Sequence, residues 1–185
     1  MSEIHKSKKH DISVGIGIIK QVIQNRGHHL DIIREALSNS CSQEVRASKV
    51  TINIFYEPPF GWSLSFEDDG LGMDYTGEEE PTKKGRLDRF LDLSYSGVMG
   101  LNTDEFSYKG LGAKLMYLCK RLEIETKTEN GKSYKVIVDD PRGKLLKKEP
   151  EKPEPQIYED SPVNFSHGTV IKILGYDNGV KYDEY

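Results

Sequence analysis

The 185-residue sequence has few cysteines and no long hydrophobic run. Its two cysteines, Cys41 and Cys119, lie far apart and belong to no Cys-x-x-Cys or Cys/His cluster. This argues against a disulfide framework or a zinc site, and it predicts reduced thiols in or near the core of a cytoplasmic protein. No apolar run approaches the ~18 residues of a membrane span, and the charged N-terminus lacks the apolar core of a signal peptide. We therefore expect no membrane segment.

The sequence also lacks an excess of positive charge. Lysine and arginine together number 26 against 30 aspartates and glutamates, a net charge of −4, whereas nucleic-acid-binding domains usually carry a basic surface. Hydrophobic residues make up 36% of the chain and charged residues 30%, which excludes collagen, a coiled coil and wholesale disorder. What remains is one α/β or α+β domain that is large enough to bury a core.

Two apolar segments near the N-terminus predict two helices in tandem. The first covers residues 12–23, and the second opens near His28 with apolar residues at i, i+3 and i+7, namely Leu30, Ile33 and Leu37. A short helix is expected over residues 87–93. Another is expected beyond Gly112, where leucines again recur at helical spacing. Residues 94–109 between these two helices predict a long irregular loop, a feature that is often functional.

Alternating apolar residues predict strands in the rest of the chain. Residues 50–54 and 62–66 flank a Pro/Gly-rich turn, and residues 122–128 and 134–138 flank an Asn-Gly turn, so we expect two antiparallel hairpins. Residues 168–175 predict a last strand. The order lacks the regular β-α alternation of a parallel sheet. We therefore predict an α+β fold, a two-layer α/β sandwich whose mixed, mainly antiparallel sheet is covered by helices on one face.

Two polar residues on the second predicted helix are candidates for chemistry. Glu35 and Asn39 are four residues apart and therefore project from the same side of a helix. A carboxylate and an amide so placed can hold a water molecule and a hard cation such as Mg²⁺, which takes oxygen ligands and keeps several of its waters. The alternative is a solvated glutamate and an asparagine that merely weakens the end of the helix.

Three further motifs have ligand-binding chemistry. Asp68-x-Gly70-x-Gly72 directly follows a predicted strand, where the glycines allow close approach to the backbone and the aspartate can accept a hydrogen bond from an exocyclic amine. The segment 109–114, Lys-Gly-Leu-Gly-Ala-Lys, opens a helix whose free N–H groups suit phosphate oxygens. Gly-Thr at 168–169 starts the last strand. Each motif alone also fits an ordinary turn or loop-to-helix junction.

In this order and spacing the four motifs resemble the GHKL ATPases, a superfamily that includes gyrase B, the ninety-kilodalton heat-shock chaperones, histidine kinases, MutL and the MORC proteins. Their shared domain is the Bergerat fold. The resemblance covers residues 12–176 as a GHKL ATP-binding domain. It leaves residues 1–11 as a flexible N-terminal tail and residues 177–185 as a C-terminal tail or the start of a following domain.

The resemblance implies that ATP is held between the helices and the sheet. Asp68 would accept a hydrogen bond from the adenine amino group, an interaction that selects adenine over guanine, and Thr169 would complete the contact directly or through water. Asn39 would bind Mg²⁺ at the phosphates, and Glu35 would orient and deprotonate the attacking water. The other nucleotide-binding residues implied are Gly70, Gly72 and Met73 in the Asp-x-Gly-x-Gly loop, and Lys109, Gly110, Gly112 and Lys114 at the phosphates.

The activity implied is Mg²⁺-dependent ATP binding with slow hydrolysis, in the N-terminal ATPase part of a larger protein. Residues 94–109 would form a nucleotide-ordered lid, and the domain would act as a switch that dimerises or docks a following domain, with nucleic acid bound only through other domains. Ser42 stands where hydrolytic relatives commonly carry an acidic residue, and no later domain supplies the completing Lys or Arg before Tyr185. Both departures imply slow catalysis.

Two alternatives stay open. The first is a protein kinase of the same fold, either an anti-sigma serine kinase, in which Glu35 would deprotonate a serine hydroxyl, or the catalytic part of a histidine kinase. The chain shows no helical hairpin with a phospho-acceptor histidine, which argues against the histidine-kinase form. The second is a nucleotide-gated binding module without turnover.

Overall fold

The computed structural model describes residues 30–80, 82–93 and 112–177 of the chain. The predicted helix over residues 12–23 and the predicted loop over residues 94–109 lie outside these ranges. The elements in chain order are α2 (Asp31–Ser40), β1 (Val50–Glu57), β2 (Gly61–Asp68), α3 (Arg86–Leu91), the 3₁₀ helix η1 (Gly112–Tyr117), β3 (Arg121–Lys127), β4 (Ser133–Asp139), α4 (Pro141–Leu146), β5 (Pro155–Glu159) and β6 (Gly168–Leu174).

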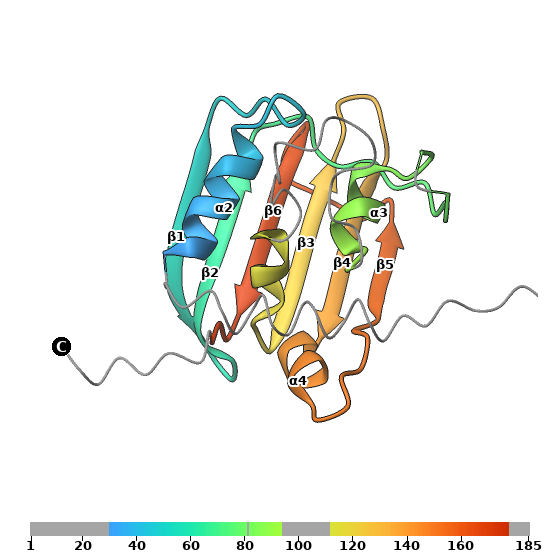
Figure 1. Cartoon of the computed structure of the whole chain (residues 1–185). Helices are drawn as coiled ribbons and strands as arrows, with labels where there is room; N and C mark the ends of the chain where they lie inside the picture. The colour runs from blue at the N-terminus through green and yellow to red at the C-terminus, as the bar shows by residue number, and fades with distance from the viewer. Residues whose placement is uncertain (1–29, 81, 94–111, 178–185) are drawn as a thin grey trace, which may run out of the picture.

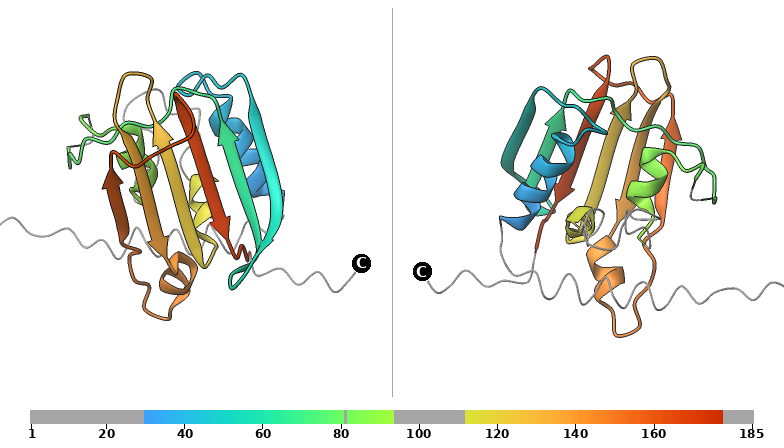
Figure 2. Two further views of the ribbon diagram at one scale, coloured as in Figure 1. Left: turned by 180° about the vertical axis from the view of Figure 1, so that it is seen from behind. Right: turned by 45° about the horizontal axis from the view of Figure 1, so that its top comes forward.

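The strands form one sheet in the order β1-β2-β6-β3-β4-β5. The helices α2, α3 and η1 lie on one face of this sheet, and the view from behind shows no described helix across the other face (Figures 1 and 2). This confirms the predicted α+β two-layer sandwich. The prediction of a mixed sheet was wrong for the described strands, because β6 enters between β2 and β3 antiparallel to both, and the remaining pairs are also antiparallel.

The core lies between the helices and rows of apolar side chains that run across the strands. Cross-strand partners in an antiparallel sheet point to the same face, so each row follows from the register. One row contains Phe66, Ile171, Ile124 and Val136, and the next contains Leu64, Ile173, Leu122 and Val138; all eight are buried. From the helical side, Ile32, Leu87 and Leu115 pack into the same cluster.

The two predicted hairpins, the helix after residue 30, the short helix near residue 87 and the last strand are all present. The segment after Gly112 is a 3₁₀ helix and not a regular α-helix. Two elements were missed. α4 has only six residues, too few to show a helical period, and is capped where Asp140 Oδ1 accepts a hydrogen bond from Gly143 N at 3.1 Å. β5 is an edge strand that begins with proline and is mostly exposed.

The two cysteines lie in different environments. Cys119 is buried, as predicted, whereas Cys41 is exposed just after α2, which corrects the expectation of a core position. Both thiols are free. Within the described ranges, no helix is both long and apolar enough to cross a membrane.

Candidate functional site

The apolar rows of the helix-covered face give way to a polar row at one end of the sheet. Asp68, the last residue of β2, pairs with Thr169 of β6, which in turn pairs with Thr126 of β3. These residues lie two positions beyond the buried row of Phe66, Ile171 and Ile124, so their side chains project from the same face. A carboxylate and two hydroxyls therefore stand side by side where the preceding rows carry only hydrocarbon.

Asp68 is held at this position by donors from two segments. Ser40 Oγ, in the last turn of α2, donates to Asp68 Oδ2 at 3.3 Å, and Gly70 N donates to Oδ1 at 3.0 Å. Burial raises the pKa of Asp68 above its ordinary value, although both hydrogen bonds oppose that rise. Each carboxylate oxygen can accept more than one hydrogen bond, so the half-buried group retains the capacity to accept from a ligand.

The neighbouring carboxylate, Asp69, has a different role. It accepts hydrogen bonds from Ser48 Oγ at 2.5 Å and from the backbone N–H groups of Ser48 and Lys49 at 2.8 Å each. These donors, with the Ser48 hydroxyl first, lower the pKa of Asp69 to about 2. Asp69 is exposed and ties the segment before β1 to the end of β2. Of the two adjacent aspartates, Asp68 is therefore the one that faces the polar row.

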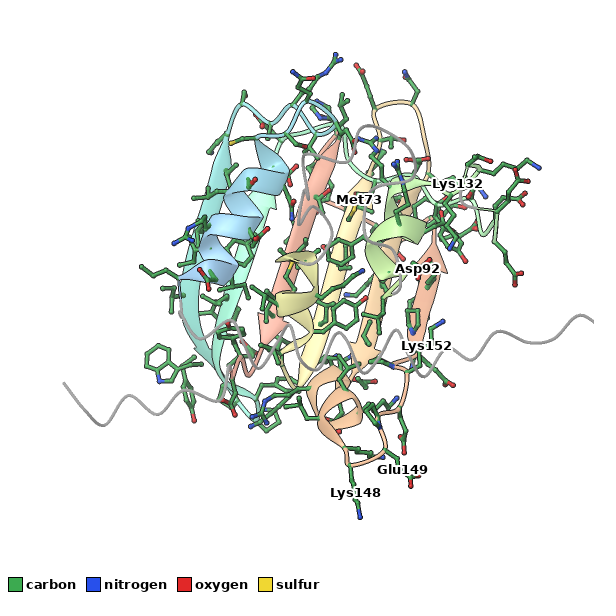
Figure 3. The ribbon with its side chains drawn as sticks, viewed as in Figure 1. Met73, Asp92, Lys132, Lys148, Glu149 and Lys152 are labelled. Atoms are coloured by element: carbon green, nitrogen blue, oxygen red, sulfur yellow. The ribbon has the colours of Figure 1, made fainter. Side chains whose placement is uncertain are left out.

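A network of hydroxyls links the rest of the polar row to the Asp-x-Gly-x-Gly loop. Thr126 Oγ1 accepts from Met73 N at 2.7 Å and donates to Gly168 O at 3.1 Å. It also lies 3.1 Å from Thr169 Oγ1. Since Thr126 uses its single proton on Gly168, the proton between the two hydroxyls belongs to Thr169. This arrangement fixes Met73 over the end of β3 (Figure 3).

Two glycines are required where these backbones meet. Gly72 has φ +66°, and a Cβ there would lie 1.9 Å from Lys127 O. Gly168 has φ +125°, and a Cβ there would lie 2.2 Å from Asp68 O. Only glycine fits either position without moving the backbone. Sequence analysis predicted close approach of a ligand at Gly72; the structure shows close approach of the chain's own Lys127 carbonyl.

The helix α2 places Glu35 and Asn39 near this end of the sheet. Ser40, which contacts Asp68, is the residue after Asn39, and Glu35 lies one turn earlier on the same side of the helix. Both side chains are half-buried. The strand register thus places Asp68 beside Thr169, and hydrogen bonds through Thr126 link Thr169 to Met73. Glu35 and Asn39 lie on the helix whose Ser40 contacts Asp68.

The predicted phosphate-binding segment is described only in part. Lys109 and Gly110 lie outside the described residues, and Gly112 begins η1. Lys114 is buried, and its Nζ donates to Asp92 O at 2.5 Å and to Phe90 O at 3.3 Å. Burial lowers the pKa of Lys114 to about 8. Its amino group therefore binds carbonyls at the C-terminal end of α3, where Asp92 is labelled in Figure 3, a role that sequence analysis did not anticipate.

Arg86 is another residue that sequence analysis missed. At the start of α3, its guanidinium donates to Asp74 Oδ1 at 3.2 Å, Glu44 O at 3.0 Å and Leu71 O at 3.3 Å. It thereby joins the segment after α2 to the Asp-x-Gly-x-Gly loop, and its charge favours the ionised form of Asp68. Arg86, Ser40 and Thr126 belong to no sequence motif. Their hydrogen-bond partners lie 12 or more residues away along the sequence, so local spacing gave no signal for them.

The described residues offer few side-chain ligands for a metal ion. Across residues 30–80, 82–93 and 112–177, no group of three or more His, Cys, Asp or Glu side chains is placed to hold an ion. Asn39 offers an amide oxygen, a hard ligand. Mg²⁺ commonly takes one or two protein oxygens and completes its shell with water and substrate phosphates. Asn39 is thus a single oxygen donor of the kind that Mg²⁺ takes.

No protein-family model matches this sequence, and no curated protein matches it. One solved structure that the chain matches is the ATP-binding domain of topoisomerase IV from Francisella tularensis, in complex with a small-molecule inhibitor. The two are 22% identical, with a TM-score of 0.46, and the match covers 78% of this chain and 36% of the other. This chain thus spans about a third of the length of that one.

Proposed function

We propose that this domain binds ATP with Mg²⁺ at the polar row, in the manner of the GHKL ATPases that its motifs resemble. The observation that carries the proposal is the environment of Asp68. A half-buried carboxylate is held by Ser40 and Gly70 and stands in register with Thr169, at the end of a face that is otherwise apolar. Such a place combines an apolar surface for a base with a directed hydrogen-bond acceptor.

The proposed adenine contact follows from the chemistry of the row. Asp68 accepts from the exocyclic amino group of adenine, and Thr169 retains acceptor capacity for a ring contact or a bridging water. Guanine carries a carbonyl oxygen at the equivalent position, so two acceptors would oppose each other. This mismatch disfavours guanine nucleotides.

The phosphates are proposed to extend toward the segment before η1. Gly110 and Gly112 would present N–H groups to them, with Lys109 adding charge and Lys114 assisting only if it leaves its carbonyl partners at Phe90 and Asp92. Asn39 would hold Mg²⁺, which neutralises phosphate charge when bound. Glu35 would orient the attacking water and accept its proton.

We further propose that residues 12–176 form the ATPase part of a larger protein, with slow turnover in isolation. Ser42 lies where hydrolytic relatives carry an acid, and the completing Lys or Arg would come from another domain or copy. Nucleotide binding would then control dimerisation or docking of a following domain. The phosphate acceptor, water or protein, distinguishes this hydrolase from a kinase.

Isothermal titration of the chain with Mg²⁺–ATP and Mg²⁺–GTP tests the site. Asp68→Asn should weaken ATP binding by about 10- to 100-fold, since a hydrogen bond to a charged group contributes about 1.5–3 kcal/mol. Asp69→Asn is the matched control because it changes the adjacent carboxylate, which faces the segment before β1. Equal ATP affinities for the two variants would refute the assignment of Asp68.

Single-turnover assays with labelled ATP test the chemistry. Phosphate released to water supports hydrolysis, and phosphate transferred to protein supports a kinase. If neither product forms, the result supports a binding module without turnover. Glu35→Gln should retain ATP binding and lose about 10²-fold or more of any hydrolysis if Glu35 is the general base. Unchanged turnover would show that Glu35 is not that base.

A further inference from the structure

An exposed apolar surface lies on the helix-covered face at the β1 edge of the sheet. It consists of Ile54, Tyr56 and Trp62, which are 65%, 63% and 66% exposed; we call it the β1 surface. Ile54 pairs with the buried Leu64, and Tyr56 pairs with Trp62, so the three strand residues share the face that elsewhere forms the core. The Tyr56 and Trp62 rings meet edge to face, with centroids 5.8 Å apart.

This surface is unusual because it continues the core without being covered by the described elements. Of the apolar stripe that the sequence predicts for this helix, Ile33 packs against the core, whereas Leu37 is 39% exposed. The helix therefore presents part of its apolar side away from the sheet. Contiguous apolar surface of this kind generally marks a place where another segment or molecule binds.

The residues that precede α2 have the composition and the reach to cover the β1 surface. The chain has 29 residues before Leu30, and residues 12–23 carry seven β-branched apolar side chains, namely Ile12, Val14, Ile16, Ile18, Ile19, Val22 and Ile23. α2 begins toward the end of the sheet where the β1–β2 turn lies (Figures 1 and 2). Six residues lie between Ile23 and Leu30, and these seven residue steps extend to about 24 Å, close to the ~26 Å length of an eight-residue strand.

We infer that residues 12–23 of the same chain pack their isoleucine and valine side chains on the β1 surface. Covalent attachment favours this occupant, because a short tether gives the segment an effective concentration in the millimolar range. A second copy at micromolar concentration competes poorly with it. The inference concerns how the domain completes its core, and it does not depend on nucleotide binding.

The single tryptophan of the chain reports on this contact directly. Trp62 is the only tryptophan, so its fluorescence and its quenching by acrylamide measure cover over the β1 surface in the full 185-residue chain. We expect Trp62 to be shielded in the native chain relative to the urea-unfolded chain. If native Trp62 is quenched as readily as unfolded Trp62, the inference is wrong, and this comparison requires no variant.

A charge-insertion variant identifies the covering segment. Ile16→Asp with Ile18→Asp should raise the quenching constant about twofold or more, because the indole passes from a covered to an exposed position. Ser2→Asp with Ser7→Asp adds the same two charges outside the apolar run and should leave quenching unchanged. Equal quenching in the two double variants would overturn the inference.

Dilution distinguishes shielding of Trp62 by the same chain from shielding by a second copy. Shielding by the same chain persists at every protein concentration, whereas shielding by a second copy falls on dilution. Shielding that appears only with a dimer in sedimentation velocity would assign the β1 surface to that second copy and overturn the intramolecular inference.

Discussion

The helix-covered face of the sheet contains two adjacent rows of side chains, and the second row lies two residues further along each strand than the first. The row of Phe66, Ile171 and Ile124 is fully apolar, and the next row is Asp68, Thr169 and Thr126. The apolar row stabilises the fold through burial, at about 25 cal/mol per Å². The polar row would destabilise it if its groups were not hydrogen-bonded, since a buried polar group without a partner costs about 1–3 kcal/mol.

On this one surface, the apolar row contributes to stability and the polar row carries the groups that can bind a ligand. The polar side chains of the second row have hydrogen-bond partners: Ser40 and Gly70 for Asp68, Gly168 and Met73 for Thr126, and Thr126 for Thr169. These partners hold the row rigid and leave acceptor capacity at Asp68. A ligand site on such a row needs little reorganisation when it binds, which favours affinity. The following changes test whether the two rows have separate roles.

The largest effect is expected in the apolar row. Ile124 is completely buried, so Ile124→Ala should lower the free energy of unfolding by about 2–5 kcal/mol through lost burial and a cavity. Urea denaturation measures this change. Glu123→Ala, one residue earlier and on the open face with an ion pair to Arg121, should cost at most about 1 kcal/mol. The nucleotide affinity of folded Ile124→Ala should be nearly unchanged, and a large loss of affinity would show that the two rows are not separate.

A smaller effect on stability is expected in the polar row. Thr126→Val keeps the shape but removes the acceptor for Met73 N and the donor to Gly168 O, so it should cost about 1–3 kcal/mol of unfolding free energy. The Asp-x-Gly-x-Gly loop would lose the hydrogen bond that holds Met73 N to Thr126. ATP affinity measured by titration should therefore fall more than in Ile124→Ala. Thr51→Val, on the open face of β1, is the control. Unchanged ATP affinity in Thr126→Val would contradict a role for this network.

The smallest effect is expected at Ser40. Ser40→Ala removes one donor to Asp68, at a cost of about 1 kcal/mol, and raises the pKa of Asp68 further. Binding needs the ionised carboxylate as acceptor, so affinity should fall on acidification, and it should begin to fall at a higher pH than for an ordinary aspartate because burial already raises this pKa. In Ser40→Ala that fall should shift to still higher pH, as measured by titrations across pH.

Ser38→Ala, on the exposed side of the same helix, provides the matched control for Ser40→Ala. Its pH profile should coincide with that of the unchanged chain. Coincident profiles for Ser38→Ala and Ser40→Ala would show that the hydroxyl of Ser40 does not hold the ionised form of Asp68.

Much of the fold could be predicted because local spacing determines it. Alternation over residues 50–54 and 62–66 predicts two strands that each carry their apolar side chains on one face. The 3.6-residue period after residue 30 likewise indicated a helix. The missed elements, α4 and β5, are short or mostly exposed, so burial imposes no period on their sequences.

The candidate site was predictable only where the chain itself carries a motif. Asp68 and Thr169 were chosen from the order of motifs, and the register places them side by side. The sequence did not indicate that Asp69 would instead accept hydrogen bonds from Ser48 and Lys49. Nor did it indicate that Lys114 would bind the carbonyls of Phe90 and Asp92.

The sequence by itself determined the α+β class, the two hairpins and the side of their strands that carries the apolar residues, because these depend on residues a few positions apart. The tertiary structure decided which groups meet: Ser40 with Asp68, Thr126 with Met73, and Arg86 with Glu44 and Leu71. These contacts join segments distant in the chain, so they exist only once the strands have paired and α2 has packed on the sheet. Directed hydrogen bonds and selective burial, the physical basis of the candidate site, arise at that stage.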